Sequence, residues 1–377
     1  MIRILFALLW VSISPLGFAA APVENEEPEV MQLVAEAVVL VDEKRFSEAL
    51  PRLEAALLIN PRSLVARYEL GVAFYAMRRY RKARRHLRKA VRLKDTSPYA
   101  FQMLGNSIDR LKHPKGAVRV YQKGLERFPN AGNLYLEMGV VEANYGSWDA
   151  ALYWWERGMV ADPGHPSNYF WAAREMARRE QWMWSFLYGE TFCNLERNTS
   201  RTGQTGALLM QVSERLFQRQ QSINGFWEPR VQIAGKERRS GVLLHDEMSP
   251  EDLEKKLALI WEVAMTLRFE EDPEWGSRAL TIEDSFRMRV FTGKLWEGQD
   301  AAHRAIPVAL FRWWNTLAKH GHLESYTMWL LAEGRQEEAE MWAEKNQEKV
   351  KALYDYMNEN PFVIDTKNSL TRLGETE

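Results

Sequence analysis

The residues best suited to chemistry in this 377-residue chain are histidines and carboxylates near two predicted helix ends. His320, His322 and Glu324 offer nitrogen and oxygen ligands of the kind that bind zinc. Histidines on a loop that ends a helix more often cap that helix or face solvent, so we expect no metal site there. The His-Asp-Glu sequence at 245–247 precedes a predicted helix and fits its N-terminal dipole better than a catalytic role.

Enzyme signatures are absent from the sequence. It has no glycine-rich phosphate loop, no Gly-x-Ser-x-Gly elbow and no His-Glu-x-x-His motif. We therefore predict no catalytic residue and no cofactor. The alternative is a cell-envelope hydrolase with its site in residues 200–377, which a cluster of buried carboxylates or histidines in a cleft would indicate.

A strongly basic segment runs from Met77 to Lys94, with ten Lys or Arg and no acid. At helical spacing Ala83, Leu87 and Ala90 turn inward and the charges cover the outer face. The simpler interpretation is a solvated face. The alternative is a docking patch for an acidic protein, for anionic lipid headgroups at a membrane surface, or for a cell-wall polymer. The formal net charge is −1 and no known nucleic-acid module is present, so we expect no nucleic-acid partner.

The first 19 residues have the pattern of a secretory signal peptide. Arg3 precedes a short apolar run at 4–13, and Gly17 and Ala19 place small residues before a plausible cleavage site. The run is shorter than the roughly 20 residues that span a bilayer. We predict export, to the periplasm if the source is a Gram-negative bacterium; the alternative is an uncleaved membrane anchor. Cys193 is the single cysteine and is predicted to be a buried small hydrophobe rather than a free or intermolecular thiol.

After an acidic linker at 20–29, small residues recur with a step of 34. One phase holds Ala37, Gly71, Gly105 and Gly139, and a second holds Ala49, Ala83, Ala117 and Ala151. Prolines end three of the four units, because proline lacks the amide donor that a helix interior needs. The pattern predicts two antiparallel helices per unit that approach closely where Gly71, Gly105 and Gly139 face the alanines of the second phase. One such unit cannot bury its own apolar face, so neighbouring units must stack.

A step of 34 with these residue types resembles the tetratricopeptide repeat family. The resemblance covers four clear repeats, 30–63, 64–97, 98–131 and 132–165, and a degenerate fifth at 166–199. It implies an all-α fold, a right-handed α-solenoid, and a concave groove lined by the first helix of each unit. The groove residues it implies are Tyr68, Tyr75, Tyr99, Gln102, Met103, Asn106, Arg110, Asn133, Leu136, Asn144, Phe170, Trp171 and Arg174, with Glu69 and Glu137 beside them.

Fourteen of the fifteen tryptophans lie after residue 140, eight of them in residues 200–377, which form a predicted Trp-rich, mainly helical domain. Glycines between 201 and 246 suggest turns and a short β-hairpin. Helices are predicted from Ser249, from Thr281 with Asp284, from 307 to 319, and as one long helix after a turn at 332–339.

The aromatic and amide residues of the predicted groove suit a peptide or a partner helix. The resemblance thus implies a protein-interaction scaffold or adaptor; a structural subunit of an envelope complex is a further alternative.

Overall fold

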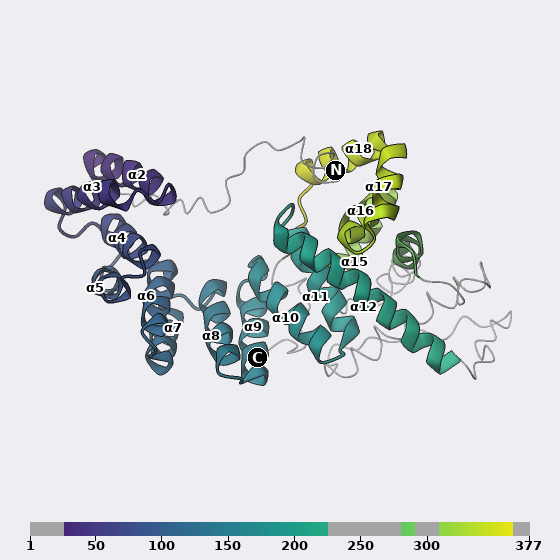
Figure 1. Ribbon diagram of the computed structural model, residues 1–377, viewed down its shortest axis with the longest axis horizontal. Helices are drawn as coiled ribbons and strands as arrows, with labels where there is room; N and C mark the ends of the chain where they lie inside the picture. Colours follow the sequence, from purple (N-terminus) through teal and green to yellow (C-terminus); the bar gives the residue numbers. More distant parts are fainter. Residues whose placement is uncertain (1–25, 225–279, 291–308, 365–377) are drawn as a thin grey trace. The chain divides into compact units, whose positions relative to one another are not determined.

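The computed structural model describes residues 26–224, 280–290 and 309–364, and all regular structure in those ranges is helical (Figure 1). The predicted all-α fold is therefore confirmed. The chain divides into two compact units, Met1–Ala151 and Leu152–Glu377. The predicted signal peptide and the helix expected from Ser249 lie outside the described residues.

Ten helices follow one another with the predicted step. They are α2 (Pro28–Asp42), α3 (Phe46–Ile59), α4 (Leu64–Ala76), α5 (Tyr80–Ala90), α6 (Pro98–Arg110), α7 (Pro114–Arg127), α8 (Gly132–Asn144), α9 (Trp148–Ala161), α10 (Pro166–Arg178) and α11 (Trp182–Leu195). In the first unit α2 packs on α3, α4 on α5 and α6 on α7; in the second, α10 packs on α11. The solenoid of helix pairs is thus confirmed, although α2 begins two residues inside the predicted linker.

A left-handed residue marks the turn inside each pair, again with a step of 34. Lys44, Arg78, Lys112, Gly146 and Glu180 have φ between 57° and 82°. Only Gly146 is a glycine, so the sequence pattern did not reveal this feature. Because the fifth turn keeps the same backbone conformation, the divergence in residues 166–199 affects side chains and leaves the helix-pair geometry intact.

The small residues of the first helices are buried where the second helices come closest. A Cβ atom built on Gly105 would lie 2.5 Å from Tyr121 Cζ, and one on Gly71 would lie 2.5 Å from Leu87 Cδ2. The nearest neighbours of these glycines are thus large side chains one turn beyond the expected alanines Ala83 and Ala117. Both alanines are fully buried, as predicted for the second small-residue phase.

The helix α12 (Ser200–Asn224) corrects the expectation of turns and a β-hairpin over residues 201–224. Gly203 and Gly206 allow close packing instead of a turn. A Cβ atom on Gly206 would collide with the carbonyl oxygen of Leu330, and one on Gly203 would lie 3.1 Å from Glu333 Cγ. Residues 225–246 of the expected hairpin lie outside the described part of the chain.

The rest of the second unit consists of short helices. Residues 282–290 are helical, followed by α15 (Ala309–Lys319), α16 (Leu323–Leu331), the 3-10 turn Ala332–Gly334, α17 (Gln336–Lys345) and α18 (Gln347–Glu359). The predicted start at Thr281 is confirmed, since its hydroxyl donates to Asp284 Oδ2 at 2.6 Å and accepts from the Asp284 amide. The prediction of one long helix after the turn at 332–339 was wrong, because α17 ends before Asn346 and α18 begins after it. The side-chain amide of Asn346 donates to the Trp342 carbonyl at 2.9 Å.

Candidate functional site: the inner face of the repeats

The first helices of the first unit contact one another in order along the chain, and we call the surface that α4, α6 and α8 share the inner face. α2 contacts α4, α4 contacts α6, and α6 contacts α8, whereas α3, α5 and α7 pack mainly on the first helices before and after them. Ten of the predicted groove residues lie on α4, α6 and α8. The exposed ones are Tyr99, Arg110 and Asn144; the half-buried ones are Tyr68, Tyr75, Gln102, Met103, Asn106 and Leu136; Asn133 is buried.

An amide network fixes the middle of this face. Glu137 Oε1 on α8 accepts hydrogen bonds from Gln102 Nε2 at 2.7 Å and from Asn106 Nδ2 at 3.1 Å, both on α6. Asn133 donates to Gln102 Oε1 at 2.9 Å, and the Tyr121 hydroxyl donates to Asn106. The network joins two successive repeats and holds the amide groups in fixed orientations.

Burial raises the pKa of Glu137, while the hydrogen bonds from Gln102 and Asn106 oppose that rise. Glu69 on α4 is only 8% exposed, and its pKa rises to about 7 because burial and then the nearby Asp42 disfavour its charge. Burial also raises the pKa of Tyr68, and Glu69 and Tyr99 add to the effect. The inner face therefore contains two carboxyl groups whose ionisation is held back by the fold.

Three predicted groove residues lie on α10, in the second unit. Phe170 is buried, and its ring centroid lies 5.1 Å from that of Phe192 and 5.3 Å from the guanidinium carbon of Arg174. Trp171 is 38% exposed and stacks on Trp155, with the ring centroids 6.0 Å apart. Phe170 thus supports the packing, and Trp171 with Arg174 presents the exposed surface of α10.

The second unit also contains a buried polar cluster that sequence reasoning missed: Glu190, Asn194, Arg289, Trp314 and Tyr326. Glu190 Oε2 forms an ion pair with Arg289 Nη2 at 2.7 Å, and Oε1 accepts from Trp314 Nε1 at 2.5 Å and from the Tyr326 hydroxyl at 2.9 Å. Asn194 Nδ2 donates to that hydroxyl at 2.6 Å. Both carboxylate oxygens are engaged, so the cluster ties four helical segments together.

One sequence signal pointed to this cluster. Glu190 is the sole charged residue in α11, which is mostly apolar, so it needs a partner in the interior. The partner Arg289 lies 99 positions further along the chain, in the helical stretch 282–290. Such a separation carries no periodic pattern, and the partner could not be identified from the sequence.

In the part of the chain that the structure describes, no group of three or more His, Cys, Asp or Glu side chains is placed to hold a metal ion. The ring centroids of His320 and His322 lie 5.1 and 4.6 Å from that of Tyr356. Glu324 accepts a hydrogen bond from Lys349 Nζ at 2.9 Å. Cys193 is fully buried, as predicted, and burial raises the pKa of its thiol. None of the described helices has both the length and the apolar character needed to cross a membrane.

Residues 40–106 match the sequence profile of the tetratricopeptide repeat. Comparison with curated protein sequences found no match. Among solved structures, PilF of Pseudomonas aeruginosa is 16% identical with a TM-score of 0.42, covering 53% of this chain and 92% of that one. PilW, described as a widely conserved type IV pilus biogenesis factor, is 17% identical with a TM-score of 0.41, covering 54% and 96%. YrrB, described as a repeat protein with an unusual peptide-binding site, is 24% identical with a TM-score of 0.32, covering 49% and 95%. The profile confirms the predicted tetratricopeptide repeats over 40–106.

Proposed function

We propose that this protein, which carries tetratricopeptide repeats in its N-terminal half, is an interaction scaffold that binds a partner peptide or helix on the inner face of those repeats. The observation that carries the proposal is the row of aromatic and amide side chains on α4, α6 and α8. Three successive repeats contribute to it, so an extended ligand could contact several of them in order.

The inner face supplies both apolar area and hydrogen-bonding groups. Tyr99 is 43% exposed at the start of α6, and Tyr68 lies near it on α4. A tyrosine contributes a large contact area with few rotatable bonds, so ordering it on binding costs little entropy. The amide network around Gln102 and Asn106 reduces that cost further, because these side chains are already held before the ligand arrives.

We further propose that the scaffold acts outside the cytoplasm. The support is the charged start, short apolar run and small residues of the first 19 positions. Edman sequencing of the mature protein from the envelope fraction tests this point. A new N-terminus close to residue 20 is expected, and a full-length protein in the cytoplasmic fraction would contradict it.

Two tyrosines provide a matched test of the binding face. Tyr99 lies on the first helix α6, whereas Tyr153 lies on the second helix α9 and is 45% exposed. Affinity capture from the envelope fraction of the source organism would compare the wild type with Tyr99→Ala and Tyr153→Ala. We expect a partner that Tyr99→Ala loses and Tyr153→Ala keeps. A partner retained equally by both variants would show that it does not bind on the inner face.

A further inference from the structure

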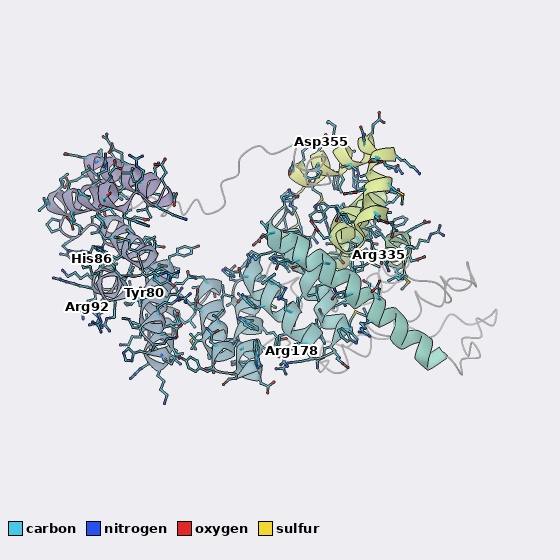
Figure 2. All side chains as sticks on the ribbon, in the orientation of Figure 1. Tyr80, His86, Arg92, Arg178, Arg335 and Asp355 are labelled. Atoms are coloured by element: carbon cyan, nitrogen blue, oxygen red, sulfur yellow. The ribbon has the colours of Figure 1, made fainter. Side chains whose placement is uncertain are left out.

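The outer surface of α5 is strongly positive. Ten Lys or Arg lie between Met77 and Lys94 without a single carboxylate, and all except the half-buried Arg84 are exposed. The whole chain has a formal net charge of −1, so the remainder carries −11. Tyr80, His86 and Arg92 mark the helix and its end in Figure 2.

The cations occupy one side of the helix. Ala83, Leu87 and Ala90 are fully buried against the neighbouring helices. At 100° per residue, the cations of α5 fill an arc of about 160° on the opposite side. The helix is also held in place at its end, because Arg127 of α7 donates to the carbonyl oxygens of Val91 and Lys94 at 3.3 and 3.0 Å. The basic side is thus an ordered surface on a fixed helix.

The described part of the fold does not neutralise these charges. Within the described residues none of the ten forms an ion pair with a carboxylate; Lys82 lies over the Phe74 ring at 5.3 Å. Like charges three or four positions apart, such as Arg81 with Arg85, destabilise a helix. The local field is also visible at His86, whose pKa falls to about 4 because of burial and the nearby basic side chains. The cations therefore cost stability in the isolated protein.

We propose that the basic side of α5 docks on an anionic phospholipid surface, where its arginines and lysines bind headgroup phosphates. Seven of the ten cations are arginines, whose planar forks match phosphate oxygens. An eleven-residue helix of about 16 Å can lie flat on the headgroups.

Two other polyanions fit this surface less well. The described exposed large apolar residues include none from 77–94, so a folded acidic protein would find no aromatic anchor of the kind that dominates protein interfaces. The segment has no Asn, Gln, Ser or Thr, the residues that with arginine read base edges, so specific recognition of a nucleic acid would lack most of its usual groups.

Vesicle flotation with the full chain tests the proposal. Vesicles of neutral phosphatidylcholine and vesicles with 30% phosphatidylglycerol would be compared, and binding to the neutral vesicles subtracted. The test variant replaces Arg81, Arg85 and Arg88 with Gln. The matched control replaces the exposed Lys115, Arg119 and Lys123 of α7 with Gln, which removes the same total charge. Glutamine retains helix propensity, so both variants should fold, and circular dichroism verifies this.

We expect the wild type to bind the anionic vesicles at low salt and to dissociate in 0.5 M NaCl. Each basic residue near an anionic surface strengthens binding about fivefold, so the α5 variant should bind on the order of 100-fold more weakly. The α7 variant should lose less than threefold. The melting temperature of the α5 variant should be unchanged or higher, which distinguishes a binding role from a structural one.

Three results would overturn the proposal. They are no binding of the wild type to anionic vesicles, an equal loss in both triple variants, and tighter binding to a 20-base-pair DNA duplex at matched phosphate concentration. Tyr99→Ala should leave vesicle binding unchanged, so the inner face and the basic side of α5 are tested independently.

Discussion

Replacing Gly105 with alanine tests the close approach of α6 and α7. A Cβ atom at this position would lie 2.5 Å from Tyr121 Cζ and 2.7 Å from Cδ1, and the Tyr121 ring is fully buried. The ring cannot move without losing its packing and its hydrogen bond to Asn106. Overpacking of this kind costs up to about 3 kcal/mol. Alanine regains about 1 kcal/mol of helix propensity, so a net loss of about 2 kcal/mol is expected.

Thermal denaturation of the full chain, followed by circular dichroism, should show Gly105→Ala melting about 4–8 °C below the wild type. Hydrogen exchange should place the loss of protection in α6 and α7. Gly164→Ala is the matched control, because the exposed Gly164 has only Asp162 Oδ1 near its Cβ position, at 3.7 Å. A Gly105→Ala variant as stable as the wild type would refute the close-packing argument.

A double-mutant cycle assigns the effect to the ring. In a Tyr121→Ala background the clash is gone, so Gly105→Ala should stabilise the protein by about 1 kcal/mol through helix propensity alone. The coupling energy between the two positions is then about 3 kcal/mol. A coupling energy near zero would show that Tyr121 does not set the limit at Gly105.

Two further predictions concern buried charges. The pKa of Glu69 is about 7 in the folded state against 4.5 for the free group, so the folded protein holds this proton more tightly than the unfolded chain. The resulting stabilisation is fully present below pH 4.5 and is lost as the pH rises through 7. Glu69→Gln should therefore match the wild type at pH 4.5 and be more stable at pH 8 by up to about 3 kcal/mol; a difference in melting temperature that is constant with pH would contradict this. Arg289→Met leaves Glu190 buried without its ion-pair partner and should cost about 3–5 kcal/mol in chemical denaturation, while adding Glu190→Gln should recover part of that loss. Equal stability of the single and double variants would contradict the coupling.

The repeats were predictable because their packing is local and periodic. A small residue every 34 positions reflects a contact within each helix pair, and the contact recurs in every unit. The partners on the inner face follow the same step approximately, since Gln102 bonds Asn133 and Glu137, 31 and 35 positions away. Repeat positions identify which side chains share the face but not which atoms pair, so the amide network required the structure.

Two features of the second unit, the helix α12 and the buried pair Glu190 and Arg289, were not predicted from the sequence, each for a physical reason. Glycine in α12 was interpreted as a turn signal, but Gly206 is there because the Leu330 carbonyl approaches too closely for any side chain. The buried pair Glu190 and Arg289 joins segments 99 positions apart, and no local pattern records such a contact. Where packing between distant segments decides the residue type, local propensity and periodicity give the wrong answer or none.

The most direct test of the scaffold account is the dissociation constant of the captured partner, measured by isothermal titration calorimetry. The wild type, Tyr99→Ala and Tyr153→Ala would be compared at the same pH and salt. Loss of an interface anchor costs at least about 1.4 kcal/mol, so Tyr99→Ala should weaken binding tenfold or more while Tyr153→Ala changes it less than twofold. If Tyr153→Ala weakened binding and Tyr99→Ala did not, the partner would bind elsewhere and the central claim would be wrong.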